Sequence, residues 1–117
     1  MGQLTTHVLD IAQGKPGAGM AVTLLRRAGE GHELIKAVTT NGDGRADMAL
    51  LEGDALRPGR YRLVFAAGAY FRRLGVALSD PPFVDEVVID FGVADGKATY
   101  HVPLLVSPWS YSTYRGS

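Results

Sequence analysis

Short runs of alternating hydrophobic and polar residues recur along the whole chain, and turns rich in glycine and proline separate them. A period of two residues is typical of strands with one buried and one exposed face. The pattern predicts about eight strands, at residues 4–11, 20–27, 33–40, 45–50, 60–67, 83–91, 97–106 and 109–115. Because Asn41–Gly44 suits a tight turn, residues 45–50 should return antiparallel to residues 33–40. We therefore expect an all-β fold of two packed antiparallel sheets, with residues 60–67 as a central strand.

One segment departs from the period of two. Tyr70, Phe71 and Leu74 are spaced as on one face of a helix, and Gly75 suits the position just beyond a helix C-terminus. The sequence therefore predicts one short helix near residues 69–75. With 117 residues and no internal repeat, we expect a single domain over residues 1–117.

The composition excludes several classes of function. Without cysteine, the chain has no disulfide, no thiolate nucleophile and no cysteine-based zinc site. Twelve Lys and Arg balance twelve Asp and Glu, so we expect no nucleic acid or anionic membrane as partner. No apolar run approaches the roughly 20 residues that span a bilayer. Residues 1–10 lack a secretory signal pattern, so we expect a cytoplasmic protein, or a periplasmic one if a leader was removed.

Three histidines are the candidate acid–base groups, and each also has a structural interpretation. His32 lies in a polar stretch of glycine and glutamate, where a solvated loop residue is expected. His7 and His101 occupy apolar strand segments, where an imidazole hydrogen-bonded to backbone or hydroxyl groups is more common than a catalytic one. Their spacing in the sequence does not pair them.

The segment Asn41–Asp47 carries alternating oxygen-bearing side chains, as at the beginning of a calcium loop. Its sixth position is Ala46 where that loop needs glycine, and no helices flank it, so a hairpin turn is favoured. Arg45 follows the turn, either as an ordinary exposed residue or as an anion-binding group. We find no phosphate-binding loop and no nucleophile-elbow motif, and we predict neither a metal site nor a cofactor.

The end of the chain alternates hydroxyl-bearing and aromatic residues from Ser107 to Ser117. An edge strand accounts for this pattern, because such side chains pair well on a pleated surface. The chain stops inside that strand, which leaves its terminal carboxylate available for a site.

Three spaced motifs together resemble the transthyretin-like 5-hydroxyisourate hydrolases of purine degradation. They are residues 5–10 followed by Gly14-Lys15-Pro16, residues 100–108, and residues 110–117, which end in Tyr-Arg-Gly-Ser. The turn at residues 41–45 and the helix at residues 68–75 agree with the same family. The resemblance implies a two-sheet, eight-stranded prealbumin-like sandwich. It also implies a homotetramer, a dimer of dimers, with active sites where the dimers meet.

The resemblance further implies that water attacks a cyclic amide of 5-hydroxyisourate and gives 2-oxo-4-hydroxy-4-carboxy-5-ureidoimidazoline, without a metal or cofactor. The implied catalytic residues are His7, Arg45, His101 and Ser117, and the implied substrate-binding residues are Tyr114, Arg115 and Gly116. One histidine would be the base and the other would orient or protonate the ring, while Arg45 would stabilise negative charge. Which histidine is the base stays open. The alternative is a non-catalytic transthyretin-like binding protein, a family that lacks the histidine pair.

Overall fold

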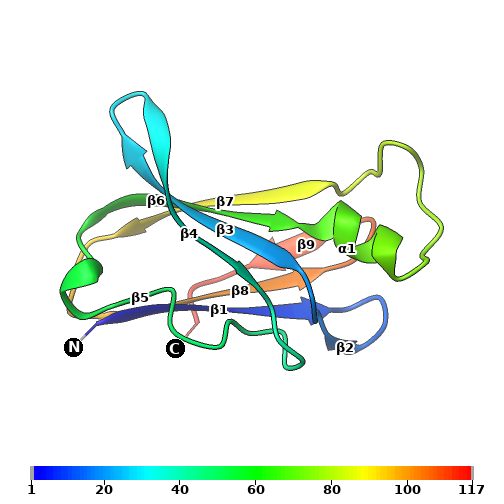
Figure 1. The fold of residues 1–117 in the computed structure, drawn as a ribbon, viewed down its shortest axis with the longest axis horizontal. Coiled ribbons are helices and arrows are strands. Elements are labelled where there is room, and N and C mark those ends of the chain that lie inside the picture. The colour runs from blue at the N-terminus through cyan, green and yellow to red at the C-terminus, as the bar shows by residue number, and fades with distance from the viewer. Residues whose placement is uncertain (1, 117) are drawn as a thin grey trace.

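A computed structural model describes residues 2–116 of the chain (Figure 1). Its strands are β1 (Gln3–Asp10), β2 (Lys15–Pro16), β3 (Ala21–Ala28), β4 (Gly31–Thr39), β5 (Leu51–Glu52), β6 (Gly59–Ala66), β7 (Glu86–Val93), β8 (Thr99–Val106) and β9 (Tyr111–Thr113). A 3₁₀ turn, η1 (Gly53–Ala55), follows β5, and a short α-helix, α1 (Ala67–Arg73), follows β6.

Two sheets pack face to face. Sheet A has the order β2-β1-β8-β9, with β5 paired to β1, and sheet B has the order β4-β3-β6-β7. Figure 1 shows the two layers, with α1 at one end of sheet B, where it connects β6 to β7. The all-β, two-sheet prediction is confirmed, and β6 is central in its sheet as predicted. Residues 2–116 form nine strands and not the predicted eight: the predicted strand at residues 45–50 is absent, and β2 and β5, with two residues each, have no hydrophobic pattern that predicts them.

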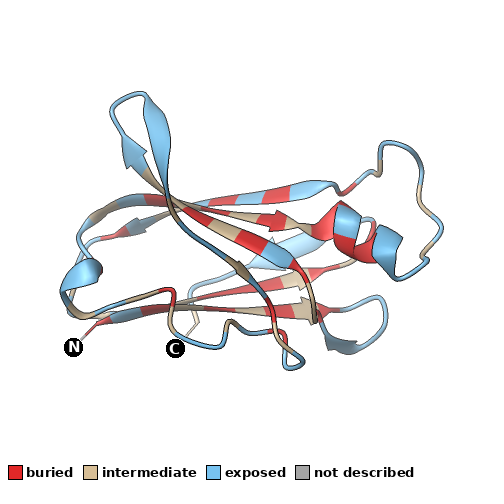
Figure 2. Cartoon of the chain, in the orientation of Figure 1, coloured by how far each residue is buried: buried red, intermediate tan, exposed pale blue. Residues whose placement is uncertain are grey.

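The core lies between the sheets and follows the predicted alternation. Figure 2 shows buried and more exposed residues alternating along the long strands. Leu4 and Val8 of β1, and Leu63 and Phe65 of β6, are fully buried. Full burial of such a side chain contributes about 1.5–3 kcal/mol. The outer faces of the strands are thereby left for residues that do not build the core.

The predicted strand at residues 45–50 is wrong. The turn at Asn41–Gly44 does not send the chain back along β4; it carries the chain across to sheet A, where Arg45 forms an isolated bridge with His7 of β1. Ladder pairing resumes at β5, which is antiparallel to β1. The turn residues adopt the expected tight turn, but their sequence does not determine which strand the following residues pair with.

The sheets are also not wholly antiparallel. β1 and β8 pair in parallel over their whole length, from Gln3 beside Thr99 to Asp10 beside Val106. A parallel pair cannot be joined by a hairpin and needs a long crossover. All of sheet B and α1 form that crossover here, so strands at opposite ends of the sequence become neighbours.

The predicted helix is present two residues earlier than expected. Tyr70 and Phe71 are buried, but Leu74 is 39% exposed and lies beyond the helix, so the apolar face is shorter than predicted. The end of α1 has the expected form. Gly75 has φ of 80°, its N–H donates to Arg72 O, and the next N–H, of Val76, donates to Phe71 O. Among residues 2–116, no helix is long and apolar enough to cross a membrane.

Two predicted strands are shorter in the structure. β7 begins at Glu86 rather than residue 83, and Phe83 is 74% exposed. β9 covers only Tyr111–Thr113, and Trp109 before it is 63% exposed, with its ring 6.3 Å from that of Phe83. In both places the alternation of hydrophobic and polar residues continues beyond the paired residues. The sequence pattern carries no information about where the partner strand begins or ends.

A buried carboxylate fixes the end of β1 against α1. Asp10 is 1% exposed and accepts hydrogen bonds from the backbone N–H groups of Ala12 and Gln13 and from the Tyr70 hydroxyl. Burial, together with the hydrogen bond to Asp10, raises the pKa of Tyr70 to about 12. Because a buried carboxylate is costly unless its oxygens are satisfied, this network holds β1 in place relative to the helix.

Candidate active site

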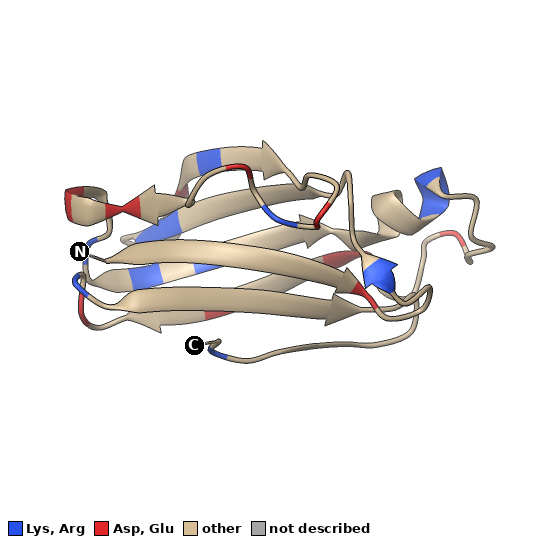
Figure 3. Cartoon of the chain, turned by 90° about the horizontal axis from the view of Figure 1, so that it is seen from below, with Lys and Arg blue, Asp and Glu red and all other residues tan. Residues whose placement is uncertain are grey.

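The outer face of sheet A brings the two apolar-strand histidines together. On β1, Leu4, Thr6 and Val8 are buried, so the alternating Thr5 and His7 lie on the outer face. In the parallel ladder Thr5 is beside His101, and His7 is beside Pro103. His7 and His101 are therefore neighbours on one face, although 94 positions separate them in the sequence. Figure 3 looks onto this face, where β1 and β8 carry few charged residues.

The turn at residues 41–44 positions Arg45 over this face. Asn41 Oδ1 accepts the N–H groups of Asp43 (2.9 Å) and Arg45 (3.2 Å), which closes the turn. Gly44 has φ of 78°, and its carbonyl accepts the N–H of Val8 at 2.8 Å. A side chain at Gly44 would collide with the Val8 carbonyl, so glycine permits this close approach. The turn is thus docked on β1, and Arg45 lies opposite His7.

The ring of His7 is held by this same turn. Its Nε2 lies 3.0 Å from the carbonyl oxygen of Asp43. A carbonyl oxygen only accepts, so Nε2 carries the proton and, in the neutral ring, Nδ1 is the acceptor. The contact fixes both the orientation and the tautomer of His7.

His101 is held from β1 by a residue that the sequence analysis missed. Thr5 Oγ1 lies 2.7 Å from His101 Nδ1. When the hydroxyl accepts the Nδ1 proton, the other ring nitrogen, Nε2, is left as an acceptor. Burial, followed by the positive charges of Arg45 and His7, lowers the pKa of His101. His101 is therefore neutral at pH 7 and able to accept a proton.

Arg45 and His101 line one cavity of about 450 Å³, which we name the histidine cavity. Thr5 contributes to its floor, and residues 46–49 form one side, including Met48, which is 75% exposed. His7 stands next to it, against Arg45. The structure thus brings His7, Arg45 and His101 together as a group that can accept a proton and hold an anion.

The C-terminal residues reach the histidines from β9. The N–H of Gly116 donates to the carbonyl of His101 at 2.7 Å, and a Cβ on Gly116 would lie 2.6 Å from His101 Cδ2. Arg115 stacks its guanidinium 4.2 Å from the centre of the Tyr100 ring and donates to Thr99 O. Tyr114, 60% exposed, and Arg115 line a separate hollow at the sheet edges, not the histidine cavity. Ser117 lies outside the described residues.

His32 is not in a loop, as predicted, but in β4, where it is exposed. It is remote from this site and lines a pocket of sheet B. Among residues 2–116, no three His, Asp or Glu side chains are grouped so that they could hold a metal ion.

Known proteins are similar to this chain in sequence and in fold. The HIUase/Transthyretin family model matches residues 4–116. The 5-hydroxyisourate hydrolase of Ralstonia nicotianae is 60% identical over 117 residues, 100% of both chains. The structure of Klebsiella pneumoniae 5-hydroxyisourate hydrolase has a TM-score of 0.82 at 38% identity, and the match covers 100% of both chains.

Two further solved structures have the same architecture. Sea bream transthyretin in complex with thyroxine has a TM-score of 0.87 at 26% identity, covering 97% of this chain and 94% of that one. The structure of (S)-allantoin synthase has a TM-score of 0.94 at 43% identity and covers 99% of this chain. The chain spans 44% of the length of that synthase.

Proposed function

The chain belongs to the HIUase/Transthyretin family, and we propose from its site that it is a hydrolase that opens a ring of 5-hydroxyisourate. The observation that carries this proposal is the convergence of Arg45 and His101 in one cavity with His7 beside them. The non-catalytic alternative is not favoured. The relative that is 60% identical is named a hydrolase, whereas the transthyretin is 26% identical.

The sequence left open which histidine is the base, and we propose His101. Each ring has one nitrogen engaged, Nε2 of His7 and Nδ1 of His101, but His101 lines the histidine cavity and His7 does not. Its lowered pKa keeps His101 unprotonated at pH 7, and Thr5 holds the ring in one orientation. General-base catalysis by a positioned imidazole contributes about 10²–10⁴ in rate.

The reaction is the addition of water across a cyclic amide. His101 Nε2 takes a proton from water as its oxygen bonds to the carbonyl carbon, and the carbonyl oxygen becomes negatively charged. Arg45 stabilises that charge through its guanidinium donors. The carbon–nitrogen bond then breaks, and the leaving nitrogen takes the proton back from His101. The product is the ring-opened carboxylate, 2-oxo-4-hydroxy-4-carboxy-5-ureidoimidazoline.

The C-terminal residues 115 and 116 contact His101 and its neighbours from outside the histidine cavity. The hydrogen bond from Gly116 holds the backbone of His101, and Arg115 is anchored on Tyr100 and Thr99. His7 would orient the substrate or water together with Arg45. As the family resemblance implies, Ser117 would orient the site through its hydroxyl or its α-carboxylate, and Tyr114 and Arg115 would shape it.

We also propose that the chain acts as a homotetramer with its sites where dimers meet. The histidine cavity is open on one side in the single chain. Large apolar side chains are exposed at the histidine cavity, as Met48 (75%), and at the β9 edge of sheet A, as Tyr111 (49%) and Tyr114 (60%). Clustered exposed apolar surface is typical of interfaces, and a second subunit would exclude water from the cavity. Light scattering during size-exclusion chromatography tests the mass of the assembly.

Product formation tests the proposed reaction. 5-Hydroxyisourate is generated from urate with urate oxidase and transferred into ¹⁸O-labelled water with or without the protein. We expect the ring-opened product, with one ¹⁸O in its new carboxylate, to accumulate faster than in the protein-free control. His101→Asn is the matched control for the base. If product appears at the spontaneous rate with tetrameric protein, the hydrolase proposal is wrong and the binding alternative replaces it.

A further inference from the structure

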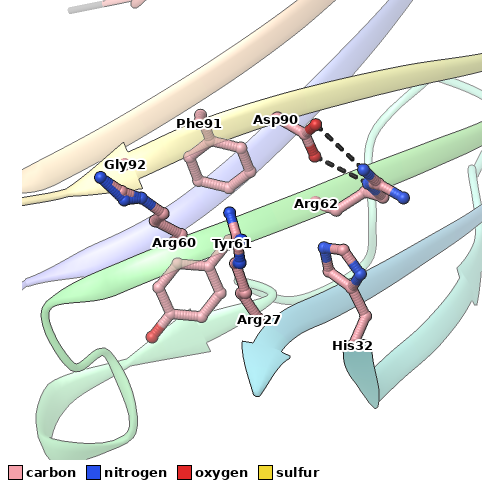
Figure 4. Close-up of a pocket in the computed structure, with 8 residues that line it drawn as sticks. All are labelled: Arg27, His32, Arg60, Tyr61, Arg62, Asp90, Phe91 and Gly92. Carbon is pink, nitrogen blue, oxygen red and sulfur yellow. Dashed lines mark hydrogen bonds and ion pairs between the residues drawn. The ribbon is translucent and has the colours of Figure 1, made fainter. Parts of the chain in front are cut away.

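A cluster of positive side chains lies on the outer face of sheet B, away from the histidine cavity. Arg27 of β3, His32 of β4, and Arg60 and Arg62 of β6 project from adjacent strands (Figure 4). With Tyr61, Asp90, Phe91 and Gly92 they line a cavity of about 470 Å³, which we name the arginine pocket. The proposed hydrolysis gives these residues no role.

The arginine pocket contains more positive than negative charge. The acidic residue in its lining, Asp90, binds Arg62 through two hydrogen bonds of 2.7 and 3.0 Å. Within residues 2–116, the structure shows no ion pair or hydrogen bond from the side chains of Arg27 and Arg60. The hydrogen bond from Arg62, followed by the charges of His32 and Arg27, lowers the pKa of Asp90. Arg27, Arg60 and Arg62 thus outnumber Asp90 in the lining of the pocket.

The register of sheet B brings these like charges together. Arg27 pairs with His32, and Arg60 pairs with Gly92. Arg26 and Tyr61 form the last pair of the β3–β6 ladder, so Arg27 and Arg60 come just beyond it on neighbouring strands. Like charges on neighbouring strands repel each other. The whole chain carries no net charge, so this local excess is not a general property of its surface.

The pocket also has room for a ligand. Gly92, opposite Arg60, faces open space: a Cβ added to it would meet no atom of the described residues within 4 Å. Tyr61, which is 2% exposed, and Phe91 pack into the core with their rings 5.9 Å apart, so the charged side chains are the groups of this pocket that a ligand can contact. Guanidinium groups bind the planar oxygens of carboxylates and phosphates through paired hydrogen bonds. The guanidinium groups of Arg27 and Arg60, and the gap at Gly92, therefore fit an oxyanion.

We propose that the arginine pocket is a second binding site, for a small polyanion that carries phosphate or carboxylate groups and binds between Arg27 and Arg60. The ligand would neutralise the repulsion between the two arginines. The site is on the opposite face of the sandwich from His7 and His101, so its occupancy does not depend on the proposed hydrolysis.

Calorimetric titration of the full chain with pyrophosphate and, separately, with citrate tests this proposal. We expect saturable binding of one anion per chain, and the preferred probe identifies phosphate or carboxylate as the favoured group. Arg60→Gln should weaken binding by about tenfold or more, because a charged hydrogen bond is lost. Arg72→Gln, on the exposed side of α1, removes the same charge elsewhere and should leave the affinity unchanged.

Asp90→Asn provides the opposite test. It removes the acid in the pocket lining and releases Arg62, so anion affinity should rise. Absence of saturable binding to the wild-type chain, or equal weakening by Arg60→Gln and Arg72→Gln, would overturn the proposal. The rate of 5-hydroxyisourate decay with Arg60→Gln, expected to equal that of the wild type, separates failure of this site from failure of the hydrolase proposal.

Discussion

The two outer faces of the sandwich use charge in different ways. On sheet A, each histidine ring is held by a residue of another segment: His7 by the Asp43 carbonyl and His101 by Thr5. On sheet B, Arg27 and Arg60 project into an open pocket, and the ion pair there joins Arg62 to Asp90. Chemistry on a reacting bond requires a fixed tautomer and orientation, whereas recognition of an anion requires charge and access.

The difference arises from how the chain covers each face. The turn at residues 41–44 and the C-terminal segment both lie against sheet A, through the Val8–Gly44 and Gly116–His101 hydrogen bonds. Together the two segments half-bury His7 and His101, and the turn also places Arg45 opposite His7. Within the described part of the chain no comparable segment lines the arginine pocket, whose residues all belong to the strands of sheet B. We therefore expect substitutions on the outer face of sheet A to lower activity strongly and substitutions in the arginine pocket of sheet B to leave activity unchanged.

The largest expected effect is that of His101→Asn. This change removes the proton acceptor but approximately preserves the volume and the hydrogen bond near Thr5. We expect kcat to fall by about 10²–10⁴, with the circular dichroism spectrum and assembly mass unchanged. Near-wild-type turnover of the folded variant would remove His101 from the mechanism.

Gly116→Ala should disturb the same ring from the C-terminal side. The new methyl group would lie 2.6 Å from His101 Cδ2, so either the imidazole or the last residues must move. We expect kcat/KM to fall at least about tenfold, since displacement of a catalytic group is costly in rate. Gly31→Ala, in β4 of the other sheet, is the matched control, because a Cβ added there comes no closer than 4.0 Å to another atom of residues 2–116. Equal rates for the two variants would show that the tail does not set the position of His101.

Thr5→Val tests whether the hydroxyl positions His101. It keeps the shape of the side chain but removes the hydrogen bond to Nδ1. We expect kcat to fall by about tenfold, the factor that corresponds to the free energy of one hydrogen bond. The pH dependence of kcat should also change, because the hydroxyl no longer selects one tautomer of His101. Thr5→Ser should restore both. A loss that serine does not restore, with an unchanged pH profile, would indicate a packing role only.

The titration of His101 gives a smaller, directional prediction. Because the pKa of His101 is lower in the folded chain than in the unfolded chain, the unfolded chain binds its proton at a higher pH than the folded chain does. The free energy of unfolding therefore decreases as the pH falls below about 6.5. Nuclear magnetic resonance of the imidazole protons should give a pKa below 6.5, and Arg45→Gln should raise it. A pKa above 6.5 in the wild type would contradict the proposed base.

The smallest expected effect lies on the second face. Arg60→Gln should leave kcat and KM for 5-hydroxyisourate unchanged while it weakens anion binding, because the arginine pocket and the histidine cavity are on opposite sheets. Steady-state kinetics of this variant beside the wild type would reveal any coupling. A substantial loss of activity would mean that the two faces are not independent.

Most of the fold could be predicted from the sequence because the core strands alternate cleanly, as in Leu63 and Phe65 of β6. The crossing of residues 45–50 to sheet A could not, because a turn such as Asn41–Gly44 has the same local signature whichever strand follows. His7, Arg45 and His101 came from motif resemblance, and the structure groups them. Thr5 was missed, because its contact depends on a parallel pairing of β1 with β8 that leaves no local pattern.

The histidine face of sheet A is what makes this chain a catalyst for opening 5-hydroxyisourate in the mechanism proposed above. The ultraviolet absorbance decay of freshly generated 5-hydroxyisourate, followed at several protein concentrations, measures that activity itself. We expect a first-order decay whose rate rises in proportion to protein, and His101→Asn should lower it toward the spontaneous value. A decay that stays at the spontaneous rate at every concentration of folded, assembled protein would contradict this mechanism.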